Sequence, residues 1–240
     1  MSKYLLFIAL PYVSVILMLI GSIYRYRYAG FKFSSLSSQF LEGKKLFWGS
    51  QPFHWGMMFL FFGHLIGFMF PESVVAMNGD PMRLVIIEIT AFGFAICALF
   101  GLLMLIRRRL TTKRIKVVTT KMDMFVLFIL LVQIGSGMWV AYFSRWGSAW
   151  FASTLTPYLK SIFALNPDME AVAAMPFAIQ LHIVSAFIMI AFIPFTRFVH
   201  FLVYPIHYIW RPFQRVIWYW DRKNIRKPDR WVKGVRSKNN

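Results

Sequence analysis

Cysteine is nearly absent from this chain: Cys97 is the only one, and it lies inside an apolar run. A single cysteine excludes a disulfide framework and any site built from several thiolates. Acidic residues are also scarce, with nine Asp and Glu against 27 Lys and Arg. The basic residues cluster between apolar runs and near the C-terminus instead of alternating with aromatics on one folded face. This distribution argues against binding to nucleic acid.

What the chain has in excess is apolar residues, at 58% of the sequence with a mean hydropathy of +0.57. Such a composition is typical of a membrane protein. A hydrocarbon core about 30 Å thick needs about 20 apolar residues of helix to cross it. Five stretches qualify, at about residues 4–23, 47–70, 83–106, 122–143 and 176–201. The sequence therefore predicts an all-α membrane protein, with a five-helix membrane domain over residues 1–204 and a basic tail over 205–240.

The loops between the predicted spans differ in charge. Segment 107–121 reads RRRLTTKRIKVVTTK, and Lys and Arg are also frequent in 24–46 and after residue 204. These segments alternate with 71–82, which has two acids and no base, and with 144–175, in which the charges balance. Short loops rich in Lys and Arg stay in the cytoplasm. We therefore expect a periplasmic N-terminus and a cytoplasmic C-terminal tail, the tail lying near anionic headgroups.

Two of the predicted spans carry two histidines each. His54 and His64 in the second span are ten residues apart, or about 15 Å along a helix. His182 and His200 in the fifth span are eighteen residues apart, which is about five helical turns and predicts that they share one face. Since the two spans run in opposite directions, His64 is expected at the depth of His182, toward the outside. His54 is expected at the depth of His200, toward the inside.

Two pairs of facing imidazoles fit two b-type haems, each with two histidine axial ligands. Neutral imidazole is tolerated in lipid, and small residues have to make room for a flat macrocycle. Gly56, Gly63 and Gly67 are expected to do so, the last two with the spacing that allows close helix approach. Arg197 is expected to pair with a haem propionate. A lone histidine in a span is more often satisfied by a hydrogen bond, but four at matched depths favour haem ligation.

Metal transport is the competing use of histidines in a membrane. It normally requires carboxylates along a shared polar path. Only Glu88 and Asp123 lie in or at the ends of the middle spans, and neither is expected beside a histidine. A haem-free anchor has no use for four depth-matched histidines. The fifth histidine, His207, follows Pro205 and is expected to be an interfacial side chain.

The chain resembles the gamma subunits of the membrane-bound respiratory nitrate reductases over nearly its whole length. The two histidine spacings are those of this family of dihaem cytochromes b. The motifs that carry the resemblance are RYRYAG and SSQFLEGKK after the first span, FHWG and GHLIGFMFP in the second, RRRL and the TT pair before the fourth, and LHIVSAF and FIPFTRFVHF in the fifth.

The resemblance implies a function and partners. His64 and His182 would hold the outer, distal haem, and His54 and His200 the inner, proximal one. The family oxidises a membrane quinol at the outer side and releases two protons there. Electrons then pass through both haems to an iron–sulfur beta subunit and a molybdenum-containing alpha subunit, which reduces nitrate in the cytoplasm. The basic tail would lie against that cytoplasmic partner.

The chain departs from the family near the expected quinol site. Relatives carry a lysine near the start of the third span, where this chain reads GDPMRLVIIEIT. Relatives often have an arginine before the LH of the fifth span, where Gln180 stands here. Gly63 is retained; Glu88 is a candidate proton acceptor from quinol, and Arg83 a candidate hydrogen-bond donor to a quinone oxygen. Each of these two charged residues is equally compatible with simply marking a helix end.

Related complexes use similar dihaem subunits, so the terminal substrate stays open at this point. A nitrite oxidoreductase running in reverse and quinone-linked complexes of sulfur metabolism are the alternatives. The short chain after the fifth span favours the nitrate reductase type. Haem-free anchors and transporters are the remaining alternatives outside the redox class.

Overall fold

The computed structural model describes residues 2–28, 38 and 41–202. These residues belong to one compact unit, Met1–Tyr204. The predicted basic tail and His207 lie outside the described residues. Within the described ranges every regular element is a helix, and no strand is present.

Five helices are long and apolar enough to cross a membrane: Ser2–Tyr28, Lys45–Met69, Pro81–Thr111, Lys121–Phe143 and Phe177–Phe195. The five predicted spans and the all-helical class are thus confirmed. The first span consists of α1 (Ser2–Tyr4), η1 (Leu5–Ala9) and α2 (Leu10–Tyr28). The others are α3 (Lys44–Met69), α5 (Pro81–Thr111), α7 (Lys121–Phe143), and α11 (Phe177–Phe192) with η4 (Ile193–Phe195).

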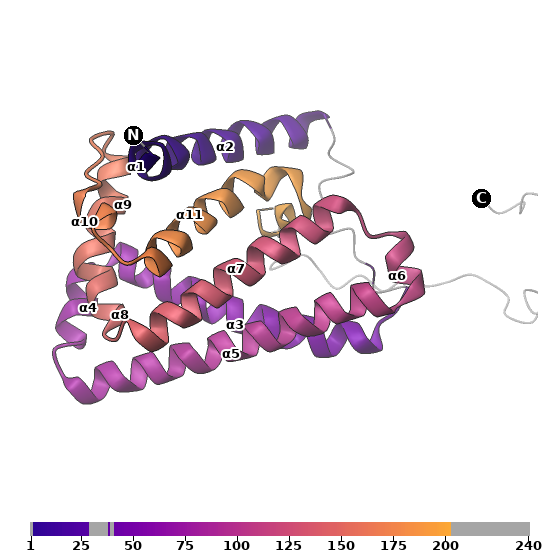
Figure 1. Ribbon diagram of the computed structural model, residues 1–240, viewed down its shortest axis with the longest axis horizontal. Helices are drawn as coiled ribbons and strands as arrows, with labels where there is room; N and C mark the ends of the chain where they lie inside the picture. The colour runs from indigo at the N-terminus through magenta and orange to yellow at the C-terminus, as the bar shows by residue number, and fades with distance from the viewer. Residues whose placement is uncertain (1, 29–37, 39–40, 203–240) are drawn as a thin grey trace, which may run out of the picture. The chain divides into compact units, whose positions relative to one another are not determined.

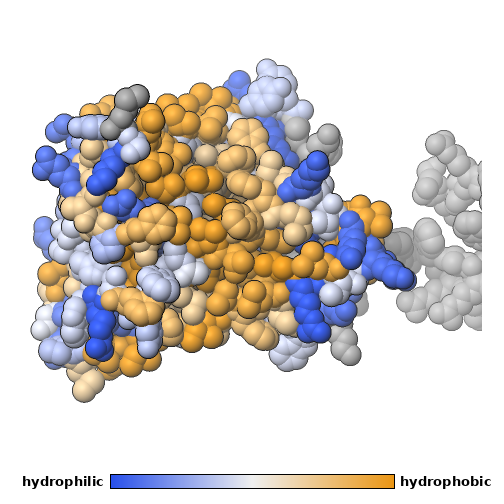
Figure 2. All heavy atoms as spheres, in the orientation of Figure 1, coloured by the Kyte–Doolittle hydropathy of each residue, from blue (hydrophilic) through white to orange (hydrophobic). Residues whose placement is uncertain are grey.

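The shorter helices gather at the two ends of this bundle (Figure 1). At one end, which we call the loop end, lie α4 (Pro71–Met77), α8 (Gly147–Trp150), η3 (Phe151–Leu155), α9 (Thr156–Phe163) and α10 (Glu170–Ala173). The opposite end, which we call the basic end, carries α6 (Lys113–Val117) and the arginines Arg107, Arg108 and Arg109. Figure 2 shows an apolar band between these ends, with hydrophilic residues at both. This pattern fits a bundle that spans a membrane.

Local sequence signals fix where the central helices begin. The Asp80 side chain caps α5 by accepting hydrogen bonds from the N–H groups of Met82 and Arg83, and Pro81 follows at the first helical position. Thr120 and Asp123 form a reciprocal capping box at the start of α7. Both α5 and α7 therefore start at defined residues.

The fifth span ends earlier than the sequence analysis predicted. Its α-helix stops at Phe192 and gives way to the 3-10 helices η4 and η5 (Arg197–Phe201). Pro194 explains this, because proline has no N–H for the helical ladder and disfavours helical geometry in the residue before it. The prediction that His182 and His200 share one face of a continuous helix is wrong.

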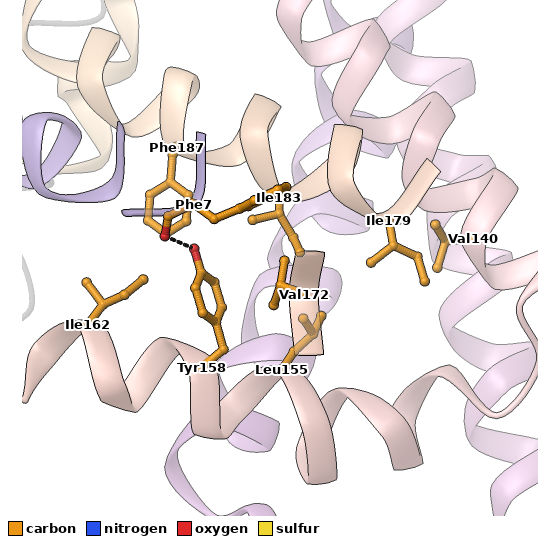
Figure 3. Close-up of a cluster of buried hydrophobic side chains, with 9 residues drawn as sticks. All are labelled: Phe7, Val140, Leu155, Tyr158, Ile162, Val172, Ile179, Ile183 and Phe187. Atoms are coloured by element: carbon orange, nitrogen blue, oxygen red, sulfur yellow. Dashed lines mark hydrogen bonds between the residues drawn. The ribbon is translucent and has the colours of Figure 1, made fainter. Parts of the chain in front are cut away.

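The core at the loop end joins the first span to the elements after α7. Phe7, Val172 and Tyr158 are almost fully buried, together with side chains from α7, η3 and α11 (Figure 3). The Tyr158 hydroxyl donates to the Phe7 carbonyl oxygen at 2.7 Å, within the π-helical η1. Burial, reinforced by Tyr12, raises the pKa of Tyr158, so its hydroxyl stays a donor. This core packs the loop end against the first part of α11.

Candidate functional site

The structure brings the four predicted ligand histidines together in the predicted pairs. The ring centroids of His64 and His182 are 6.3 Å apart, and those of His54 and His200 are 6.2 Å apart. A ring nitrogen lies about 1.1 Å from the centre of an imidazole and binds a transition metal at about 2.0 Å. Two imidazoles on opposite sides of one ion therefore have centroids about 6 Å apart. Both pairs have the spacing of two axial ligands.

The hydrogen bonds of these rings fix their tautomers. Nδ1 of His54 lies 2.8 Å from the Ser50 carbonyl oxygen, and Nδ1 of His64 lies 2.7 Å from that of Leu60. Nδ1 of His200 lies 2.6 Å from the Arg197 carbonyl oxygen, and Nδ1 of His182 lies 3.1 Å from that of Gln133. A carbonyl oxygen only accepts, so each Nδ1 carries the proton and each Nε2 keeps its lone pair. This is the arrangement typical of metal-ligating histidine.

The pair at the basic end depends on the turn that carries His200. Arg197, in the same 3-10 turn, pairs with Asp123 on α7, with Nε 2.6 Å and one terminal nitrogen 3.2 Å from the two carboxylate oxygens. Arg109 also contacts Asp123, at 3.4 Å. Asp123 thus contacts the turn that carries His200 through Arg197 and not through the histidine itself. The predicted pairing of Arg197 with a propionate stays a prediction, beside the ion pair that the structure shows.

The three glycines expected near the rings have different surroundings. An added Cβ at Gly56 would lie 2.6 Å from the Phe94 carbonyl oxygen, so this glycine permits close packing of α3 against α5. At Gly67 the nearest atoms are those of the Phe151 ring, at 2.9 Å, and at Gly63 nothing lies within 4 Å. The spacing of Gly63 and Gly67 predicted close helix approach at both positions. The structure shows it only at Gly67, where the missing side chain leaves room for the Phe151 ring of η3. Gly63 does leave open space next to His64.

The two charged candidates for a quinol site lie in the first part of α5. Arg83 belongs to its first turn and is exposed, and one carboxylate oxygen of Glu88 is enclosed with no hydrogen-bond partner among the described residues. Phe59 on α3 stacks on Phe94 of α5 at 4.0 Å. Because these helices are antiparallel, Glu88 comes level with His64.

The arrangement of these histidines gives little support for a site that binds a metal ion without a macrocycle. Among the described residues no three His, Cys, Asp or Glu side chains come together as a possible metal site. A pair of imidazoles suits an ion whose other ligands belong to a macrocycle. The residues present thus fit haem better than a transported metal.

Several residues beside His182 were missed by the sequence analysis. Gln133, Ser136 and Gly137 on α7 and Ser185 on α11 all lie within hydrogen-bonding or packing distance of His182 or of its partners. Their signal was present, because a polar side chain inside a span is a candidate functional residue. Gln133, Ser136 and Ser185 nevertheless have no motif or charge that separates them from ordinary helix-packing residues in the sequence.

Comparison with known proteins bears on this geometry. A family model described as nitrate reductase gamma subunit matches residues 3–219. The chain belongs to the nitrate reductase gamma subunit family. It is 32% identical over 216 residues to the nitrate reductase gamma chain of Bacillus subtilis strain 168, covering 89% of this chain and 97% of that one. It is 29% identical over 209 residues to the respiratory nitrate reductase 2 gamma chain of Escherichia coli K12, covering 86% and 92%.

Family membership confirms the resemblance that the sequence motifs indicated. It makes the chain a membrane-anchoring, multi-pass subunit of an oxidoreductase complex. A gamma chain implies further subunits in that complex.

Proposed function

We propose that this gamma subunit is the dihaem cytochrome b of a respiratory nitrate reductase, which oxidises quinol and passes the electrons inward. The observation that carries the proposal is the presence of two histidine pairs with centroids 6.2 and 6.3 Å apart, all four with a protonated Nδ1. His64 and His182 would hold the outer haem, and His54 and His200 the inner one. When bound, each haem carries one electron at a time.

The protein matrix would supply position and insulation. His54 and His64 lie on one helix, so α3 sets the separation of the two sites at about 15 Å along its axis. Neutral imidazoles in an apolar bundle avoid the cost of a buried charge. Carbonyl oxygens on Nδ1 would keep each ring in the tautomer that leaves Nε2 as the metal-binding nitrogen.

The quinol would bind at the loop end, next to His64. The open space at Gly63 would admit a flat ring, and the enclosed, unpaired oxygen of Glu88 would accept a quinol proton. Arg83 would donate a hydrogen bond to a quinone oxygen. Replacing Glu88 with Gln tests this role: slower quinol oxidation with both haems present supports it, and an unchanged rate rejects it.

The partners follow from orientation and charge. With the loop end outside and the basic end in the cytoplasm of an inner membrane, protons would be released outside while electrons move inward. An iron–sulfur beta subunit would receive the electrons and pass them to a molybdenum-containing alpha subunit. The basic tail 205–240 would contact that cytoplasmic partner and anionic headgroups.

The deciding experiment is a reduced-minus-oxidised optical spectrum of the purified complex, with haem counted per gamma chain. Two b-type haems, reducible by a quinol analogue, are expected. A folded preparation without b-type haem would overturn the proposal. The neighbouring subunits of the same preparation would separate nitrate reduction from nitrite oxidation or sulfur metabolism.

A further inference from the structure

Three polar side chains are buried inside the apolar bundle around His182. Gln133 and Ser136 on α7 are 9% and 8% exposed, and Ser185 on α11 is 1% exposed. Burying an amide or a hydroxyl among apolar groups is costly unless it is hydrogen-bonded. The burial of these three polar side chains in two membrane spans therefore needs an explanation other than helix formation.

Nδ1 of His182 is held by the main chain and a side chain of α7. It lies 3.1 Å from the Gln133 carbonyl oxygen and 3.1 Å from the Ser136 hydroxyl, which itself donates to the Gln133 carbonyl. This approach is possible because an added Cβ at Gly137 would lie only 2.9 Å from Cε1 of His182. Because Gly137, four residues after Gln133, has no side chain, the His182 ring can reach the Gln133 carbonyl oxygen.

The Gln133 side chain extends the same contact. Its Oε1 accepts a hydrogen bond from the Ser185 hydroxyl. Its Nε2 lies 3.1 Å from Nε2 of His182, so this amide contact and binding of a metal by the same nitrogen are alternatives, and the clamp rests on the contacts to Nδ1. The Ser185 hydroxyl also lies 3.1 Å from the His182 carbonyl oxygen, so its single proton is shared between two acceptors. The network thus links α7 to the ring and to the helix that carries it.

Among the described residues, the other three paired histidines receive no Nδ1 contact from another helix. Nδ1 of His54 and His64 bonds to the carbonyl four residues earlier on α3, and that of His200 to the carbonyl three residues earlier in η5. His54 gains the Ser50 hydroxyl as well, again from its own helix. Among the four, His182 is the one whose Nδ1 is bound by a different helix.

We propose that Gln133, Ser136 and Ser185 form a positioning clamp that fixes the ring plane of His182 and lowers the reduction potential of the outer haem. The proposal rests on the proposed function. Acceptors on Nδ1–H make an imidazole a stronger donor, which favours the oxidised metal. A ring held by two helices also keeps a defined angle to its partner, here 34° between the His64 and His182 planes.

A purely structural role would give different results. Polar side chains between membrane helices commonly serve only to hold the helices together. Loss of such a contact would weaken the bundle without a preference for one haem. The clamp instead predicts effects on the outer haem alone.

The test uses the purified complex with Ser136→Ala, titrating both haems optically against potential. The outer haem should become easier to reduce, since Nδ1 of His182 loses one of two acceptors, while the inner midpoint stays unchanged. Ser136→Thr keeps the hydroxyl and should restore the original value. Equal shifts at both haems, or none at either, would overturn the clamp.

A second variant, Gln133→Leu, keeps the main-chain carbonyl but removes the link to Ser185. The angle between the imidazole planes governs the low-spin ferric EPR signal, so the outer signal alone should move, or the outer haem alone should be lost. Gln180→Leu is the matched control, because Gln180 lies on the same helix and donates to the Ala173 and Met175 carbonyls instead. An unmoved outer signal in Gln133→Leu, or the same change in the control, counts against the clamp. Absence of haem in the unmutated complex would reject the proposed function itself.

Discussion

The two histidine pairs have nearly the same spacing but are supported in different ways. At the loop end, His64 and His182 both lie on long α-helices, and residues of α7 hydrogen-bond to Nδ1 of His182. At the basic end, His54 lies on α3, but His200 lies on the short 3-10 helix η5. The angle between the ring planes is 34° in the first pair and 63° in the second.

The position of His200 depends on tethers outside its own turn. Arg197 is bound to Asp123 on α7, and the Thr196 side chain caps η5 by accepting from the Phe198 N–H. Arg25 on α2 donates to the Pro194 and Thr196 carbonyl oxygens. Two histidines can therefore lie opposite their partners without sharing one helix face. Here an ion pair from a distant helix holds the turn that carries His200 after α11 has ended.

The largest effect is expected from removing a ring. His182→Ala should eliminate the outer haem and quinol oxidation, whereas His200→Ala should eliminate only the inner haem and leave the outer one reducible by quinol. Each variant loses one of two metal-binding imidazoles at a site, and one axial ligand does not hold a low-spin haem. Haem content per chain and the optical spectrum of each variant check this. Retention of both haem signals in His182→Ala would disprove the pairing.

The next effect concerns the tether. Asp123→Asn should selectively lower the occupancy of the inner haem, since it removes a charged acceptor for Arg197 worth about 1.5–3 kcal/mol. Asp123→Glu should restore part of it. Glu42→Gln is the control, because it breaks the Glu42–Arg108 ion pair, which has its Nε–Oε2 contact at 2.7 Å and also lies at the basic end. Equal haem loss in the control would show that the tether has no specific role.

The sequence predicted the spans and the pairing because both depend on residue type and linear distance. Apolar runs of the right length and histidines at opposed depths are properties of the chain itself. The end of α11 was missed although Pro194 was visible, because the eighteen-residue spacing was interpreted as a continuous helix. The proline in FIPF therefore indicated a helix end at this point. The helical spacing of His182 and His200 was given more weight.

Other features could not be obtained from the sequence. The approach of Gly137 to His182 and of Arg197 to Asp123 joins residues 45 or more positions apart, which only the packed helices bring together. Gly56 was expected to make room for a macrocycle, but it packs directly against another helix. The element it faces is α5, and nothing in the sequence of α3 specifies that choice.

The two glycines near the rings allow packing and binding to be separated. Gly56→Ala should destabilise the bundle, because its Cβ would lie 2.6 Å from the Phe94 carbonyl and 2.7 Å from the Ala98 nitrogen. Overpacking of this kind costs about 1–3 kcal/mol. Gly63→Ala meets no atom within 4 Å and should not lower the thermal midpoint, because alanine is also the better helix former. If Gly63 borders the quinol site, this variant should raise the KM for quinol; an unchanged KM would remove Gly63 from that site.

The smallest effect concerns pH at the basic end. Burial opposes ionisation of Glu42, but the Lys45 N–H and the Arg108 guanidinium outweigh it and hold its pKa below the usual 4.5. A carboxyl with a lowered pKa stabilises the fold above its ordinary pKa, and this contribution is lost as the pH falls through the lowered value. Thermal unfolding of the wild type and of Glu42→Gln should therefore differ at pH 7 and converge as the pH falls through the lowered pKa of Glu42. A difference that persists at low pH would mean that the charge of Glu42 is not what holds the loop to Arg108.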